Sequence, residues 1–316
     1  MIVTVTLNPS LDRTIEIGDL VRGQVIRAGS THLEPGGKGV NVSRALLAND
    51  VPSRAVVPCG GDEGGQLIRL LVAEGVDVRA VPIAGRTRSN ITLAEPDGTV
   101  TKINEPGPEL TGDEFAAITD RVLIEAADGG VVVVCGSVPP GLPTQVFLAL
   151  CQRVVAAGAR LVVDTSGPAL RAAARAGAAL LKPNRDELAD AVGRPVTSLS
   201  DAIDAAEELR SEGARAVLAS LGADGAVLVG STGAITGDTP VSRPRSSVGA
   251  GDALLAGFLA AGGVDGASAP TALAEALAWG AAAVSLPGSR MPRPADLHRD
   301  LVRINTRPGD IRPLLA

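Results

Sequence analysis

Aromatic side chains are nearly absent from this sequence of 316 residues. Only 1% of the chain is aromatic, with three Phe, one Trp and no Tyr. Nucleic-acid binding calls for basic patches and aromatic stacking platforms, whereas this chain has 29 basic and 35 acidic residues and a formal net charge of −6. We therefore expect no nucleic-acid partner, and we expect a core of aliphatic and alanine side chains.

Cysteine and histidine are also scarce. The three cysteines lack CxxC spacing and lie in or beside apolar runs, which predicts buried free thiols: Cys59, Cys135 and Cys151. Two histidines exclude a His-rich metal site. No uncharged apolar run reaches about 20 residues, and residues 1–10 predict a strand rather than a signal peptide. We expect a cytoplasmic protein that does not contact a membrane.

Lysine is also scarce. Of the 29 basic residues, 26 are Arg and only Lys38, Lys102 and Lys182 are Lys. A lysine offers a compact, mobile ammonium that the planar guanidinium of Arg does not replace. Each retained lysine is therefore a candidate binding residue, and each lies in a motif described below.

From about residue 131 the chain alternates short apolar strands with alanine-rich helices. Strands are predicted at 131–135, 161–164, 178–181 and 216–222, and helices at 144–158, 200–212 and 252–261. This pattern predicts an α/β fold whose mainly parallel sheet has helices on both faces. Ligands of such sheets bind at the carboxyl ends of the strands, so the polar loops there are the first candidates for a site.

The first hundred residues differ, because segments 12–33 and 87–107 alternate apolar and polar residues. Alternation of this length predicts strands with one solvated face. The two segments together predict a small β lid over the strand ends, inserted in an α/β core formed by 1–11, 34–86 and 108–316. The alternative is a pair of edge hairpins with no role in a site.

Two glycine-rich loops precede helices, at 35–41 (PGGKGVN, before an apolar helix at 42–48) and at 247–252 (SVGAGD). Backbone amides at a helix start bind anions. Neither loop matches GxxxxGK[ST] or GxGxxG, which disfavours a P-loop enzyme and a Rossmann dehydrogenase. A carboxylate directly after a glycine turn, here Asp252, suits a base that accepts a hydroxyl proton beside an anion hole. The alternative is that Asp252 only caps its helix.

Five ordered motifs resemble those of the ribokinase-like (PfkB) carbohydrate kinases. They are PGGKGVNVSRAL (35–46), CGSVPPG (135–141), KPNRDEL (182–188), SLGADGA (220–226) and SSVGAGDALLAGFL (246–259). The segments TLNPSLDRT (6–14), TRSNIT (87–92) and TKINEPGP (101–108) are similar to the phosphofructokinase and tagatose-phosphate kinase branch. The resemblance implies a three-layer sandwich with a β lid, ATP and Mg²⁺ as cofactors, and a homodimer formed through the lid.

The resemblance also implies residue roles. Asp252 would be the general base, and Gly249, Ala250 and Gly251 the anion hole. The sugar-phosphate site would contain Asp12, Gly37, Lys38, Asn41, Arg88, Lys102, Ser137 and Arg27. Three of these cations, Lys38, Arg88 and Lys102, would converge on a phosphate that the substrate already carries. The alternatives are solvated surface charges for the cations and a turn position for Asp12.

The nucleotide side is implied in the same way. ATP would contact Lys182, Asn184, Ser220, Gly222 and Gly225, and Asn184 with Glu187 would hold Mg²⁺ largely through water. The Asn184–Glu187 spacing is equally that of a capping box. The implied reaction moves the γ-phosphoryl of ATP to a primary hydroxyl of a phosphorylated ketohexose, with fructose 1-phosphate favoured over tagatose 6-phosphate and fructose 6-phosphate. A non-catalytic sugar-phosphate-binding protein is the alternative from another class.

Overall fold

The computed structural model describes residues 1–127, 129–306 and 313–315, and within them the strands form two separate sheets. The larger sheet has ten strands in the order β14-β13-β12-β11-β10-β9-β8-β1-β4-β5. Its strands are β1 (Ile2–Thr6), β4 (Ser53–Cys59), β5 (Asp77–Pro82), β8 (Val131–Cys135), β9 (Arg160–Asp164), β10 (Leu180–Leu181), β11 (Val217–Ser220), β12 (Ala226–Gly230), β13 (Gly233–Asp238) and β14 (Arg303–Asn305).

The strands from β5 to β11 pair in parallel, and β12, β13 and β14 continue the sheet in antiparallel pairs. Helices connect the strands. They are α1 (Lys38–Leu47), α2 (Gly61–Glu74), α3 (Gly112–Glu125), α4 (Thr144–Ala156), α5 (Pro168–Arg175), α6 (Arg185–Val192), α7 (Leu199–Ser211), α8 (Ala250–Ala260) and α9 (Ala269–Val284). The predicted α/β class with a mainly parallel sheet is confirmed.

Strand periodicity divides the core into layers. In β8, Val132 and Val134 pack into the cluster that contains the buried faces of α3 to α7. The alternate residues, Val131, Val133 and Cys135, pack into the cluster of α1, α8 and α9. Because successive side chains of a strand point to opposite faces, a continuous valine run serves two helical layers at once. This is the sandwich that the family resemblance implies.

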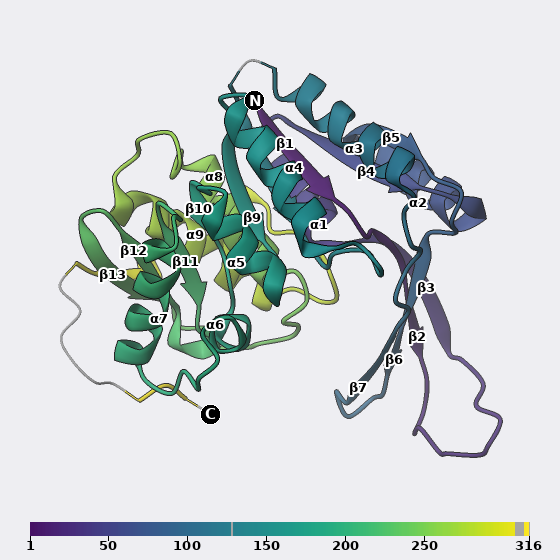
Figure 1. Cartoon of the computed structure of the whole chain (residues 1–316). Coiled ribbons are helices and arrows are strands. Elements are labelled where there is room, and N and C mark those ends of the chain that lie inside the picture. Colours follow the sequence, from purple (N-terminus) through teal and green to yellow (C-terminus); the bar gives the residue numbers. More distant parts are fainter. Residues whose placement is uncertain (128, 307–312, 316) are drawn as a thin grey trace.

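The second sheet has four strands in the order β3-β2-β6-β7. They are β2 (Ser10–Glu16), β3 (Ser30–Gly36), β6 (Arg88–Ala94) and β7 (Val100–Asn104). The first two lie in or next to the segment 12–33, and the other two lie in the segment 87–107. Figure 1 shows this sheet extending away from the larger body. We call it the lid sheet.

Helix α1 begins at Lys38, four residues before the predicted helix at 42–48. Gly37 precedes it with φ 117°, a conformation that side chains disfavour. A Cβ at Gly37 would also lie 2.6 Å from Thr6 Cγ2. Lys38 therefore belongs to a helical turn rather than to a glycine loop, which determines where its side chain points.

The cysteines are unpaired, as predicted, although Cys59 is only partly buried whereas Cys135 and Cys151 are fully buried. In the part of the chain that is described, none of the helices combines the length and the apolar character needed to cross a bilayer.

Candidate active site

The predicted base lies in the first turn of α8. The N-cap of this helix is Gly249, at φ 76°, and no side chain caps the helix, so the capping interpretation of Asp252 is wrong. Asp252 is buried, and its Oδ2 accepts a hydrogen bond of 2.8 Å from Asn41 Nδ2 of α1. Burial, with the negative charge of Asp164 added, raises the pKa of Asp252 to about 6. A carboxyl group with this pKa can accept and release a proton near neutral pH.

Asp164, at the end of β9, joins two lysines. Its side chain is fully buried; Oδ1 lies 2.7 Å from Lys38 Nζ and Oδ2 lies 3.0 Å from Lys182 Nζ. Lys38 Nζ also lies 2.9 Å from Glu187 Oε1. Although burial works to lower it, the pKa of Lys38 is raised above its ordinary value by these two carboxylates. The lysine is therefore a permanent cation between them.

Lys182 lies between Asp164 and the glycine turn before Asp252. Its ammonium is 3.4 Å from the position that a Cβ on Gly251 would take. A buried ammonium beside the backbone amides at the start of α8 makes this end of the helix electropositive. The predicted anion hole at Gly249, Ala250 and Gly251 thus has a cation beside it.

Asn184 and Glu187 form a complete capping box at the start of α6. Asn184 Oδ1 accepts from the Glu187 amide at 2.8 Å, and Glu187 Oε2 accepts from the Asn184 amide at 2.9 Å. The capping interpretation of this motif is confirmed. The donor set also fits a hydrated magnesium ion, because Mg²⁺ takes oxygen ligands and keeps much of its water. Since both Glu187 oxygens accept hydrogen bonds, water would separate this carboxylate from the ion.

Asp12 lies within β2, not in a turn, and polar neighbours hold its carboxylate. Asp12 Oδ1 accepts hydrogen bonds from Ser10 Oγ at 2.6 Å and from Asn90 Nδ2 of β6 at 2.9 Å. Asn90 Nδ2 also donates to Ser10 Oγ at 3.0 Å. On β3, a Cβ at Gly36 would lie 2.3 Å from Asp12 Oδ2. The absence of a side chain at Gly36 therefore leaves the space that Asp12 occupies.

Arg88 shares a face of the lid sheet with Asp12 and Asn90. Ser10 pairs with Arg88 and Asp12 with Asn90 across the β2–β6 ladder, so these four side chains point to one side. Arg88 Nη1 donates to Glu105 O at 3.1 Å, and its Nε is buried with no hydrogen-bond partner in the described part of the chain. Burial lowers the pKa of Arg88, and the negative charges of Asp12 and Glu105 oppose that shift. A partly buried, incompletely paired guanidinium is suited to an anionic ligand.

Comparison with known proteins shows the family of this chain. The model of the pfkB family carbohydrate kinases matches residues 5–296. The chain belongs to the pfkB family. It is 35% identical over 260 residues to 1-phosphofructokinase of Bacillus subtilis (strain 168), an alignment that covers 82% of this chain and 85% of that protein. The resemblance inferred from the motifs is confirmed, and the chain is a carbohydrate kinase.

Two further relatives connect this pfkB chain to phosphofructokinases. The chain is 35% identical over 293 residues to ATP-dependent 6-phosphofructokinase isozyme 2 of Escherichia coli (strain K12), covering 92% of this chain and 94% of that protein. The crystal structure of phosphofructokinase-2 from Escherichia coli in complex with fructose-6-phosphate superposes with a TM-score of 0.86 at 33% identity, covering 93% and 96% of the two chains.

The predicted phosphate cations of this pfkB chain do not all gather at Asp12. Lys102 pairs across the ladder with Thr92, on the same face of the lid sheet as Arg88, and is exposed. Lys38 differs from the prediction, because its ammonium contacts Asp164 and Glu187 instead. The lid sheet supplies the two remaining cations of the predicted group.

Arg27 lies at the opposite end of the lid. It belongs to the loop between β2 and β3, where the Gly29 amide donates to Glu16 O at 2.8 Å. Glu16 is about 13 Å along β2 from Asp12 at the rise of an extended strand. Arg27 lines a hollow of about 510 Å³ there with Glu16 and Glu95. Within one chain, the structure does not bring Arg27 to the other predicted residues.

The other predicted residues follow strands of the large sheet. Ser137 Oγ accepts from Asn8 Nδ2 at 3.2 Å, which ties the loop after β8 to the loop after β1. Ser220 lies at the end of β11 and forms a backbone bridge with Asn184, and its amide donates to Pro183 O at 3.0 Å. Gly222 begins the short 3₁₀ turn η1 (Gly222–Asp224), and Gly225 follows it. The two predicted nucleotide segments, the start of α6 (184–187) and the turn 220–225, are therefore direct neighbours.

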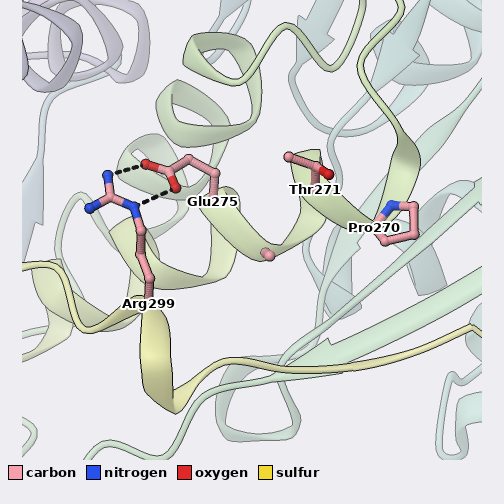
Figure 2. Close-up of a pocket in the computed structure, with 5 residues that line it drawn as sticks. Pro270, Thr271, Glu275 and Arg299 are labelled. Atoms are coloured by element: carbon pink, nitrogen blue, oxygen red, sulfur yellow. Dashed lines mark hydrogen bonds and ion pairs between the residues drawn. The ribbon is translucent and has the colours of Figure 1, made fainter.

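A second hollow lies away from these residues. It has a volume of about 370 Å³ and is lined by Pro270, Thr271 and Glu275 of α9 with Arg299. Figure 2 shows Arg299 and Glu275 pointing toward one another and joined by paired hydrogen bonds, the longer one 2.7 Å. Because its charged groups neutralise each other, this hollow lacks the free cation that a phosphate would need.

Two site residues were not found from the sequence. Asp164 closes the predicted strand 161–164, and an aspartate at the carboxyl end of a buried strand was the available signal. Asn90 lies in the segment 87–107, where only the strand register shows that it faces Asp12.

Proposed function

We propose that this protein transfers the γ-phosphoryl group of ATP to fructose 1-phosphate and forms fructose 1,6-bisphosphate. The observation that carries the proposal is the buried carboxyl group of Asp252, held by Asn41 at 2.8 Å with a pKa of about 6 at the glycine turn of α8. Catalysts of phosphoryl transfer act mainly by positioning and by electrostatic stabilisation, and these residues supply both.

Asp252 would accept the proton of the attacking hydroxyl group. The amides of Gly249, Ala250 and Gly251, with the Lys182 ammonium beside them, would stabilise the negative charge of the phosphoryl group in transfer. Asn184 and Glu187 would hold Mg²⁺ through water. When bound, magnesium neutralises charge on the β- and γ-phosphates of ATP.

The lid sheet would recognise the sugar phosphate. Asp12, held by Ser10 and Asn90, offers a partly buried carboxylate acceptor for sugar hydroxyls, and a site built to hydrogen-bond hydroxyl groups discriminates against deoxy analogues. Arg88 and Lys102 on the same face would bind the phosphate that the sugar already carries. Gly37 and Asn41 would line the site from the side of α1, and closure of the lid would exclude water.

Fructose 6-phosphate is the second candidate substrate. One relative is an ATP-dependent 6-phosphofructokinase, and the Escherichia coli structure described above contains fructose-6-phosphate. The same two cations can bind either phosphate of a ketohexose, because its ends are nearly symmetric. Tagatose 6-phosphate differs from fructose 6-phosphate only in the configuration of one hydroxyl group.

A substrate panel tests the proposal. ADP release is measured with Mg²⁺ and ATP while fructose 1-phosphate, fructose 6-phosphate, tagatose 6-phosphate and ribose are offered separately. We expect the highest kcat/KM with fructose 1-phosphate. A higher kcat/KM with fructose 6-phosphate or tagatose 6-phosphate reassigns the substrate, and a preference for ribose contradicts the role of the lid cations. Magnesium-independent binding of sugar phosphate without any turnover would favour a non-catalytic binding protein.

We also propose that the protein forms a homodimer through the lid sheet. The face opposite Asp12 presents Ile15, Ile91, Leu93 and Ile103, of which Ile103 is 53% exposed. Apolar side chains on an extended sheet are stabilised when a partner covers them. Light scattering should give twice the mass of one chain, and Ile103→Asp should shift the protein toward monomer; a wild-type monomer contradicts the proposal.

A further inference from the structure

The C-terminal residues Pro313, Leu314 and Leu315 lie against the nucleotide side of the proposed site. Pro313 forms a backbone bridge with Ser198, and the Leu314 amide donates to Thr197 O at 2.9 Å. The Leu314 side chain packs on the core cluster that contains the buried faces of α3 to α7. The segment is therefore anchored at the start of α7, and Figure 1 shows it near α6 and α7.

Leu315 connects the two segments that the sequence predicts to contact ATP and magnesium, the start of α6 and the turn 220–225. Its amide donates to Asp224 Oδ2 at 2.6 Å, and Asp224 lies in the turn between Gly222 and Gly225. Its carbonyl accepts from Arg185 Nη1 at 2.6 Å, and Arg185 directly follows Asn184. The amide and the carbonyl of Leu315 are thus both hydrogen-bonded, the amide to the turn 220–225 and the carbonyl to the start of α6.

We propose that residues 313–315 form a strap that orders the nucleotide site by joining the start of α6 (184–187) to the turn 220–225. This inference rests on the proposed function and on the sequence prediction that ATP contacts Asn184, Ser220, Gly222 and Gly225. The hydrogen bonds of the strap come from backbone atoms of Leu315, whereas the groups they hold are the side chains of Arg185 and Asp224. Leu315 is accordingly a positioning residue and needs no contact with the nucleotide.

The negative charge of Asp224 explains why the strap would affect nucleotide binding. Asp224 is 9% exposed, and a buried carboxylate requires hydrogen-bond donors. In the turn that would approach ATP, a carboxylate that moved toward the phosphates would repel them. The Leu315 amide directs Oδ2 toward the C-terminal segment. Losing this donor would loosen the turn and weaken nucleotide binding, without any effect on Asp12 and the lid.

The test compares two substitutions at one position. Proline at residue 315 has no amide hydrogen, so Leu315→Pro removes the bond to Asp224. Leu315→Ala keeps both backbone groups and is the matched control, because the leucine is 63% exposed. Binding of ADP with Mg²⁺ is measured by calorimetry in the full-length protein without sugar. The loss of one hydrogen bond to a charged group predicts a rise of about 10-fold in the Kd for ADP.

We expect Leu315→Ala to bind ADP as the wild type does, and the KM for the sugar phosphate to be unchanged in both variants. Should Leu315→Pro fail to fold, Arg185→Met removes the other contact of Leu315 and is expected to weaken ADP binding in the same direction. Wild-type affinity for ADP in a folded Leu315→Pro protein overturns the strap, as does a lower Tm without a change in Kd. If the wild type binds no ADP, the proposed nucleotide site itself is refuted.

Discussion

Ser10 and Asn90 hold the carboxylate of Asp12, and each can be substituted separately. Asn90→Ala is the most informative substitution. Asn90 Nδ2 lies 2.9 Å from Asp12 Oδ1 and 3.0 Å from Ser10 Oγ. Hydrogen bonds to charged groups contribute about 1.5–3 kcal/mol. The bond from Ser10 Oγ at 2.6 Å remains in the variant, so we take the lower value. Since 1.4 kcal/mol is a factor of ten, kcat/KM for the sugar phosphate should fall about 10-fold.

The assay is steady-state ADP release with each substrate varied in turn. The KM for ATP should be unchanged, because Asn90 lies on the lid sheet. Ser89→Ala is the matched control, since Ser89 is the adjacent residue of β6 and points to the other face. If Asn90 acts only by holding Asp12, adding Asn90→Ala to the Asp12→Asn variant should lower kcat/KM little further. A kcat/KM within twofold of the wild type, or full additivity of the two losses, would refute this account of Asp12.

Further predictions concern the base, the lid cation and the glycine beside Asp12. Asp252→Asn should lower kcat by at least about 100-fold, measured with saturating substrates; near-normal turnover would exclude Asp252 as the base. Because the pKa of Asp252 is raised to about 6 and the ionised form accepts the proton, kcat/KM should rise with pH through about 6 and then level off. A flat profile between pH 5 and 8 contradicts this. Above that pKa the buried charge destabilises the fold, so Asp252→Asn should raise Tm at pH 8; an equal or lower Tm would show that the charge is compensated. Lys102→Met should raise the KM for the sugar phosphate about 10-fold and leave the KM for ATP unchanged. An unchanged KM for the sugar phosphate would show that Lys102 is only a solvated surface charge. Gly36→Ala would place a Cβ 2.3 Å from Asp12 Oδ2 and should weaken sugar binding as Asn90→Ala does; a wild-type KM would show that Asp12 relaxes without loss.

The local pattern of apolar and polar residues was sufficient to predict several helices and strands. The valine run 131–135 forms β8 with the predicted bounds, and the helix predicted at 144–158 is α4, which ends two residues earlier. The apolar-polar alternation of 12–33 and 87–107 predicted strands with one solvated face, and the four strands of the lid sheet lie there or within two or three residues of it. These features depend on neighbouring residues of the chain, which the sequence displays directly.

Lys38 shows where local pattern was not sufficient. It lies in a glycine-rich segment, and the family resemblance implied that it joins Arg88 and Lys102 at a substrate phosphate, but helix α1 begins at Lys38, whose ammonium contacts Asp164 and Glu187. These partners lie 126 and 149 residues away along the chain. Which carboxylates attract a cation is decided by where the fold places the end of β9 and the start of α6 relative to Lys38, and spacing in the sequence does not describe that placement.

The sequence by itself determined the α/β class, the order of the motifs and the family, because each depends on periodicity or on residues within one short segment. Only the tertiary structure decided that Asn90 holds Asp12, that Asp164 joins Lys38 to Lys182, and that Leu315 contacts Asp224. These are contacts between segments far apart along the chain. Their geometry depends on strand register and on helix packing, and a shift of one residue in register would turn Asn90 to the opposite face.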